Sequence, residues 1–208
     1  MSLEAWGLFA AFWVLFVTTP GPNAVNCIQN GMSLPFWRAM WGVAAILTQA
    51  SVFLLLSAAG VTALLVTSPT AFLWAKLVGA GFLVWIGIRG WRAAAKPVTA
   101  SARSGRHVYL HALALATINA KSVAGYLAAF TQFIQKDTPV WDQMAVIMPT
   151  ALTLTALSYT GFTLLGAGLG KLALGAVMNR RFRRVMAVCF VLYGALLGAS
   201  ALPSQAVP

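Results

Sequence analysis

Apolar residues dominate this chain in six long runs, which are separated by short segments rich in polar, basic or helix-breaking residues. A transmembrane helix needs about 20 mostly apolar residues to cross about 30 Å of hydrocarbon, and each run is long enough for that. The pattern therefore predicts an all-α integral membrane protein with six transmembrane helices. The expected spans are about 5–31, 39–66, 70–91, 108–134, 143–168 and 185–202.

Two of these spans, the first and the fourth, contain residues that disfavour a continuous helix. The first holds Thr18-Thr19-Pro20-Gly21-Pro22-Asn23, in which two prolines remove backbone donors and clash with preceding carbonyls. The fourth holds the polar segment 117–122. Backbone groups freed at membrane depth must be satisfied by protein or by a water-lined cavity. We therefore expect spans one and four to be interrupted and to border a cavity; a purely structural kink is the alternative.

The two halves of the chain share this pattern. A shift of 98 residues places Pro22 on Ala120 and Asn23 on Lys121, so that the two interrupted spans overlie each other. Because each half has three spans, the halves would cross the membrane in opposite senses, as in many secondary transporters. The pattern predicts one transporter domain, 1–208, with repeats at about 1–95 and 107–208 and a basic linker at 96–106.

Composition supports lipid as the solvent of this chain. Hydrophobic residues make up 60% of it and charged residues only 8%, with a mean hydropathy of +0.82. A soluble domain carries about 25% charged residues. The net charge of +11 is compatible with nucleic-acid binding, but the basic residues lie between apolar runs, where they set membrane topology. The expected partner is the lipid bilayer, with no nucleic acid.

The loop charges predict an orientation. One side of the six-span arrangement carries eleven basic residues, whereas the other carries all three acidic residues and few basic ones. Since basic loops stay in the cytoplasm, both termini are expected outside, in the periplasm. The eleven basic residues are Arg38, Arg89, Arg92, Lys96, Arg103, Arg106, Lys171, Arg180, Arg181, Arg183 and Arg184.

The fourth span carries a basic residue near the middle of the membrane, Lys121, between Asn119 and Ser122. A central lysine costs roughly 2.5–3.5 kcal/mol on insertion scales, and no acidic residue of the spans can pair with it. Helix ends at a break carry partial charges that hold an ammonium or a carboxylate. We therefore expect Lys121 and the break at Pro20–Asn23 to bind an anionic group together.

Further polar residues lie within the spans. Thr19, Asn23 and Asn26 share one helical face, which either lines an access path or bonds to neighbouring helices. Gln49 and Thr153 add polarity to spans two and five, where helix–helix bonding is the commoner role. The candidate substrate-binding or translocation residues are Thr19, Pro20, Gly21, Pro22, Asn23, Asn26, Gln49, Asn119, Lys121, Ser122 and Thr153.

The sequence lacks the arrangements that enzymes and metal proteins need. It has no acidic residue within a span, no Ser-His-Asp or His-Glu-x-x-His pattern and no phosphate-binding loop. We expect no enzymatic activity, no cofactor and no metal site. The chain also has no ATP-binding module, so any pumping would use an ion gradient or a partner.

Several segments resemble the LysE/RhtB family of amino-acid exporters. They are Thr19-Pro20-Gly21-Pro22-Asn23, the glycine-rich stretch 76–92, the pair Gln132-Phe133 and the basic run before the last span. One element departs from the family pattern, because Asn-Pro-Lys is here Asn119-Ala120-Lys121. The resemblance implies a secondary transporter of the bacterial inner membrane that exports amino acids or close derivatives and is driven by the proton gradient.

The cation at Lys121, with no carboxylate in the spans, favours a neutral, zwitterionic substrate over a dibasic one. Two alternatives stay open, namely a channel or exporter for another small anion or metabolite, and a non-transporting membrane scaffold subunit. The substrate, the coupling residue (Lys121 or His111) and the oligomeric state also stay open, a homo-oligomer included.

Overall fold

The structure, a computed structural model, describes residues 1–95, 107–135, 137–177 and 179–201, and for a few helical residues, Lys121 among them, only the backbone. The expected linker at 96–106 lies outside the described residues. Within them every element is a helix. The helices are α1 (Leu3–Thr18), α2 (Pro22–Ser33), α3 (Phe36–Thr67), α4 (Pro69–Ala93), α5 (Val108–Ile118), α6 (Ala120–Phe133), α7 (Val140–Leu169), α8 (Lys171–Val177) and α9 (Arg180–Ala201).

Four segments are by themselves long and apolar enough to cross a membrane, namely Phe36–Ala63, Leu73–Ala93, Val140–Leu169 and Arg180–Ala199. Helices α1 and α2 meet the same criteria as a pair, bent by 58°. The described chain therefore has four or five candidate spans, which confirms a multi-pass helical protein. The expected span at about 108–134 is divided into α5 and α6, with 11 and 14 residues, so the count of six stays a prediction.

Both expected interruptions are present. Helix α1 ends at Thr18, and α2 begins at Pro22 after an extended Gly21. The hydroxyls of Thr18 and Thr19 donate to the carbonyls of Val14 and Leu15, at 2.6 and 2.5 Å, and so occupy carbonyls near the end of α1. The second break is a single extended residue, Asn119, between α5 and α6.

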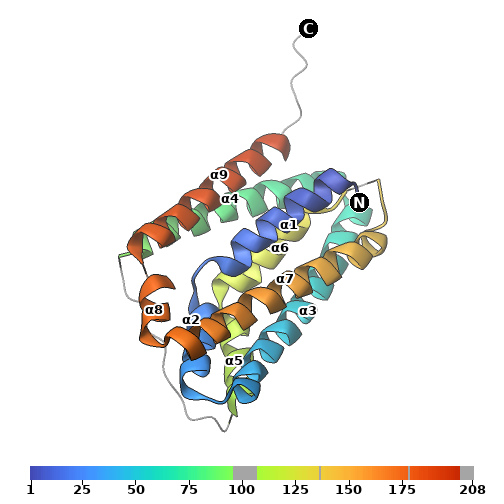
Figure 1. Ribbon diagram of the computed structural model, residues 1–208. Coiled ribbons are helices and arrows are strands. Elements are labelled where there is room, and N and C mark those ends of the chain that lie inside the picture. The colour runs from blue at the N-terminus through green and yellow to red at the C-terminus, as the bar shows by residue number, and fades with distance from the viewer. Residues whose placement is uncertain (96–106, 136, 178, 202–208) are drawn as a thin grey trace.

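The helices pack in layers, and Figure 1 shows α1 and α6 between the α4–α9 pair and the α3–α7 pair. Helices α4 and α9 approach closely because glycines face backbone at their contact. A Cβ at Gly87 would lie 2.6 Å from the Ala187 carbonyl oxygen, and one at Gly194 would lie 2.8 Å from that of Ala80. These contacts align the two helices antiparallel along their length.

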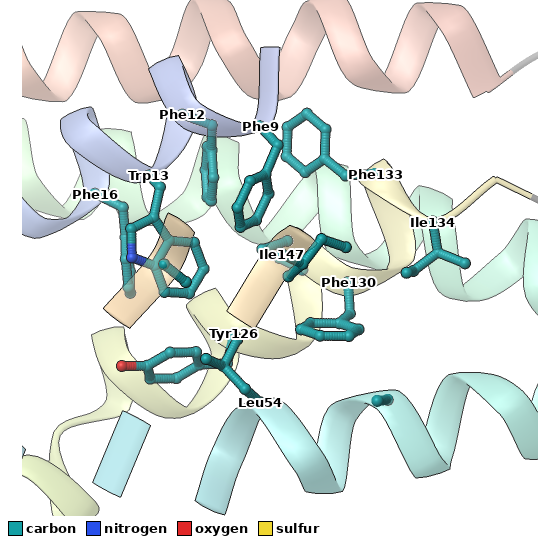
Figure 2. Packing of buried hydrophobic residues seen from close by; sticks show 14 of the residues in the cluster. Phe9, Phe12, Trp13, Phe16, Leu54, Tyr126, Phe130, Phe133, Ile134 and Ile147 are labelled. Atoms are coloured by element: carbon teal, nitrogen blue, oxygen red, sulfur yellow. The ribbon is translucent and has the colours of Figure 1, made fainter. Parts of the chain in front are cut away.

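An aromatic core fills the space between α1 and α6, as Figure 2 shows. Trp13 is fully buried, and its indole N–H donates to the Thr155 hydroxyl of α7 at 3.0 Å. A Cβ at Gly125 would overlap the Phe16 ring, so this glycine lets α6 approach α1. The aromatic core consists of Phe9, Phe12, Trp13, Phe16, Tyr126, Phe130 and Phe133.

The sequence analysis missed one element. Span five was expected to end at about residue 168, and α7 does end at Leu169, but the short helix α8 comes directly after it. Gly170 makes this turn with a φ of 52°, a left-handed conformation that side chains with a Cβ rarely adopt. A seven-residue helix gives too short an apolar period to be recognised from sequence.

Candidate functional site

A cavity of about 560 Å³ lies where the two helix breaks meet. We call it the break cavity. Both breaks contribute to its wall, and α4 and α9 complete it. The lining residues are Thr19, Pro20, Gly21, Pro22, Trp85, Ile86, Arg89, Gly90, Ala93, Leu115, Ile118, Asn119, Arg183, Ala187 and Phe190. The structure thus brings together two segments that are about a hundred residues apart in the sequence.

Two helices end and two begin at the edge of the break cavity, so partial backbone charges of both signs lie there. Helix α2 starts at Pro22, and its N-cap residue Gly21 offers no side chain to bond the free amides of the first turn. Helix α6 starts directly after Asn119. Such N-termini carry partial positive charge and bind anions, whereas the C-termini of α1 and α5, at the same edge, carry partial negative charge. The backbone therefore offers amide donors for a carboxylate, and the partial negative charge of the C-terminal helix ends favours a nearby ammonium group.

Two arginines that were not among the predicted site residues, Arg89 and Arg183, line the break cavity. The guanidinium of Arg89 lies over the Trp85 ring, 5.1 Å from its centroid. Arg183 donates from Nη2 to the Ala93 carbonyl at 2.8 Å and from Nη1 to the Ala94 carbonyl at 3.3 Å, at the C-terminus of α4. No acidic residue of the described chain lines this cavity. The side chains around it therefore favour an anionic group.

The spacing of residues in α4 could have predicted which of them line the break cavity together. Trp85, Arg89 and Ala93 are spaced four residues apart and so share one face of a helix. The spacing shows which residues share a face, but it does not show which neighbouring helix that face meets.

Behind the first break, buried and half-buried amide side chains form what we call the amide seam, which comprises Asn23, Asn26 and Asn30 of α2 and Gln49 of α3. Asn23, Asn26 and Gln49 are at most 4% exposed. Asn30 lies against α3, because a Cβ at Gly42 would be 2.7 Å from its Nδ2. Gln49 is two helical turns further along the same face of α3.

The polar atoms of the amide seam are poorly satisfied. Asn23 Oδ1, Asn26 Nδ2, Asn30 Nδ2 and both amide atoms of Gln49 have no hydrogen-bond partner within the described chain. A buried polar atom without a partner costs about 1–3 kcal/mol. Next to the break cavity, the seam thus presents hydrogen-bonding groups without partners among the described residues.

The remaining candidate residues lie on α6 and α7. Lys121 is in the first turn of α6, and its side chain lies outside the described residues. Ser122 is buried in the same turn. Thr153 is exposed on α7 and does not line the cavity; the buried threonines of that helix are Thr155 and Thr163. The structure therefore places Thr19–Pro22 and Asn119 at the cavity and Asn23, Asn26 and Gln49 behind it.

The described residues contain no group of three or more side chains suited to hold a metal ion.

Comparisons with known proteins cover nearly the whole chain. A family model described as LysE type translocator matches residues 14–201. An uncharacterized membrane protein of Vibrio cholerae is 30% identical over 204 residues, which cover 96% of this chain and 99% of that protein. The homoserine/homoserine lactone efflux proteins of Salmonella typhimurium and Salmonella typhi are each 26% identical over 203 residues, 96% of this chain and 98% of theirs. No solved structure matches the chain significantly.

Proposed function

The chain belongs to the LysE type translocator family, and from this membership we propose that it exports a small amino acid or amino-acid derivative across the bacterial inner membrane. Neutral, zwitterionic substrates are favoured. The family is one of transporters, and the apolar helices make this chain a multi-pass membrane protein. The homoserine/homoserine lactone efflux proteins among its relatives support a small amino-acid-type substrate.

The observation that carries the proposal is the break cavity. Its volume of about 560 Å³ lies within the usual range for small-molecule sites, about 300–1,000 Å³. The helix N-termini and the guanidinium groups of Arg89 and Arg183 suit a carboxylate, and the carbonyl ends of α1 and α5 suit an α-ammonium. A dibasic substrate would bring a second cation next to the two arginines, with no acidic lining residue of the described chain to compensate it.

The proposal includes the arrangement in the membrane. The chain forms one transporter domain of six spans in two inverted repeats, with both termini in the periplasm and the arginine-rich end of α4 and α9 in the cytoplasm. The distribution of basic residues supports this orientation. Export is driven by the proton gradient, as the resemblance to the LysE/RhtB exporters implies. Lys121 and His111 are the candidates for the coupling residue.

The test is counterflow in proteoliposomes with a panel of neutral, acidic and dibasic amino acids, with and without a protonophore. We expect saturable exchange that is fastest for small neutral amino acids, and net export that collapses with the protonophore. Failure of folded protein to transport any amino acid would contradict the proposal. Flux that does not saturate would favour a channel, and constitutive co-purification with one partner, without transport, would favour a scaffold subunit.

A further inference from the structure

A second pocket, of about 510 Å³, lies at the other end of the helices that line the break cavity. We call it the terminal pocket. Ala5 and Leu8 of α1, Lys76 of α4, Gln132 of α6, Leu197 of α9 and Asp137 of the α6–α7 connection contribute to its wall. Nothing in the family membership assigns a role to it.

The two pockets lie on one line through the protein. Helix α4 reaches the terminal pocket at Lys76 and the break cavity at Arg89, and these thirteen residues correspond to about 20 Å of helix. Helix α9 runs antiparallel, with Arg183 at the break cavity and Leu197 at the terminal pocket. The pockets therefore lie at opposite ends of the α4–α9 pair, and the direct route from one to the other runs between this pair and helices α1 and α6.

The aromatic core closes this route between the pockets. The Phe12 ring stacks on Phe16 with centroids 5.9 Å apart and lies 5.5 Å from the rings of both Phe133 and Tyr193. Figure 2 shows Phe12, Phe16 and Phe133 converging between α1 and α6. The Tyr193 hydroxyl donates to the Leu8 carbonyl at 2.5 Å and so ties α9 to α1. A charged solute cannot pass this apolar layer without a rearrangement of these rings.

The terminal pocket differs from the break cavity in its charge. Among the described residues, it is lined by one cationic and one anionic side chain, Lys76 and Asp137, together with the amides of Gln132 and Gln135. A zwitterionic amino acid carries the complementary pair, a carboxylate and an α-ammonium. Charge-assisted hydrogen bonds to such groups are about twice as strong as neutral ones.

The α6–α7 connection, which carries Asp137, is bonded to the buried side chain of Gln143. Gln143 is fully buried, and its amide N–H donates to the carbonyls of Gln135 and Thr138, both at 2.8 Å. Its oxygen accepts from the Gln135 backbone N–H at 2.9 Å. The Gln132 amide also donates to the Lys76 carbonyl and so joins α6 to α4. The two charged residues thus come from elements fixed relative to each other.

We propose that the terminal pocket is a second binding site for zwitterionic amino acids, from which the exported substrate is released. The Lys76 ammonium binds the substrate carboxylate, and the Asp137 carboxylate binds the α-ammonium. The aromatic core separates this site from the break cavity and opens during transport. This inference rests on the proposed export function.

The test compares Lys76→Met and Asp137→Asn with wild type in counterflow, with homoserine supplied in turn on each side of oriented proteoliposomes. We expect both variants to raise the half-saturating concentration on the terminal-pocket side about tenfold, which matches the lower end of the range for a hydrogen bond to a charged group. The value on the break-cavity side should change less than twofold. Asp142→Asn is the matched control, because Asp142 is an exposed acidic residue near the same end that does not line the pocket.

Homoserine lactone separates the two proposed contacts, because it keeps the ammonium and lacks the carboxylate. Used as a competitor on the terminal-pocket side, homoserine lactone should bind Asp137→Asn more weakly than wild type. Its affinity for Lys76→Met should equal that for wild type. If wild type exchanges homoserine but both variants keep wild-type half-saturation on that side, the release site is wrong and the export function stands. If wild type exchanges no amino acid, both the proposed export function and the proposed release site are wrong.

Discussion

The two helix breaks that meet at the break cavity are built by different chemistry. The first leaves Thr19, Pro20 and Gly21 outside the helices and bends the chain by 58°. The second is the single residue Asn119, with no proline on either side. Proline cannot donate a backbone hydrogen bond and clashes with the preceding turn, so Pro20 and Pro22 with Gly21 between them favour a break, whereas the single Pro149 is accommodated inside α7. The second break depends on the packing of its neighbours.

The breaks also differ in the residues that come after them. The first leads into the amide seam, in which five buried amide atoms lack hydrogen-bond partners within the described chain, and the second leads into Lys121. We infer a division of roles in which the first break supplies a fixed helix end and the second supplies a charge directly after the break. Substitutions at each break and in the amide seam test this division.

The largest effect is expected at the second break, from Lys121→Ala. Loss of the cation should reduce amino-acid counterflow about a hundredfold, since a hydrogen bond to a charged group is worth up to about 3 kcal/mol. Lys121→Arg, which keeps the charge, should retain measurable transport. Normal expression with wild-type rates in Lys121→Ala would make this lysine structural.

The next effect is expected at the first break, from the double variant Pro20→Ala/Pro22→Ala. Each proline disfavours a helix interior by about 3 kcal/mol, so their removal should let α1 and α2 approach one continuous helix and distort the cavity. Counterflow should fall about tenfold. Pro149→Ala is the control, because Pro149 lies inside α7 and does not line the cavity. Equal losses in both proteins would show that the break has no special role.

A smaller effect on transport is expected in the amide seam. Gln49→Leu removes two unpartnered polar atoms, so the melting temperature should rise, by an amount equivalent to about 1–3 kcal/mol, while counterflow falls severalfold. Gln143→Leu is the contrast, because that buried amide makes three hydrogen bonds and its loss should lower the melting temperature. A lower melting temperature in Gln49→Leu would mean that its amide is satisfied in the folded protein.

The smallest effect is expected from Ala120→Pro, which restores the Asn-Pro-Lys element of the family. Ala120 is the first residue of α6, where proline is well tolerated, and Asn119 already has the extended conformation that proline requires before it. We expect transport within about twofold of wild type and a gain of about 0.4–1 kcal/mol in stability. A large loss of transport would indicate that the second break must straighten during the cycle.

The sequence predicted more of the fold than of the site. The low content of charged residues determined that the chain needs lipid as its solvent, because it could not cover its surface with polar groups in water. Pro20 and Pro22 determined the first break through their covalent structure. Both break positions were predicted, and so were Thr19–Pro22 and Asn119 as cavity residues.

The walls of the cavity were decided by tertiary structure. Arg89 and Arg183 lie at the site because glycines bring α4 and α9 together, and Thr153 lies on the exposed side of α7. Helical spacing shows which residues share a face, but in a membrane the lipid-facing side is as apolar as the buried side. The sequence by itself therefore determined where the helices break, and only their packing decided which charged side chains surround the breaks.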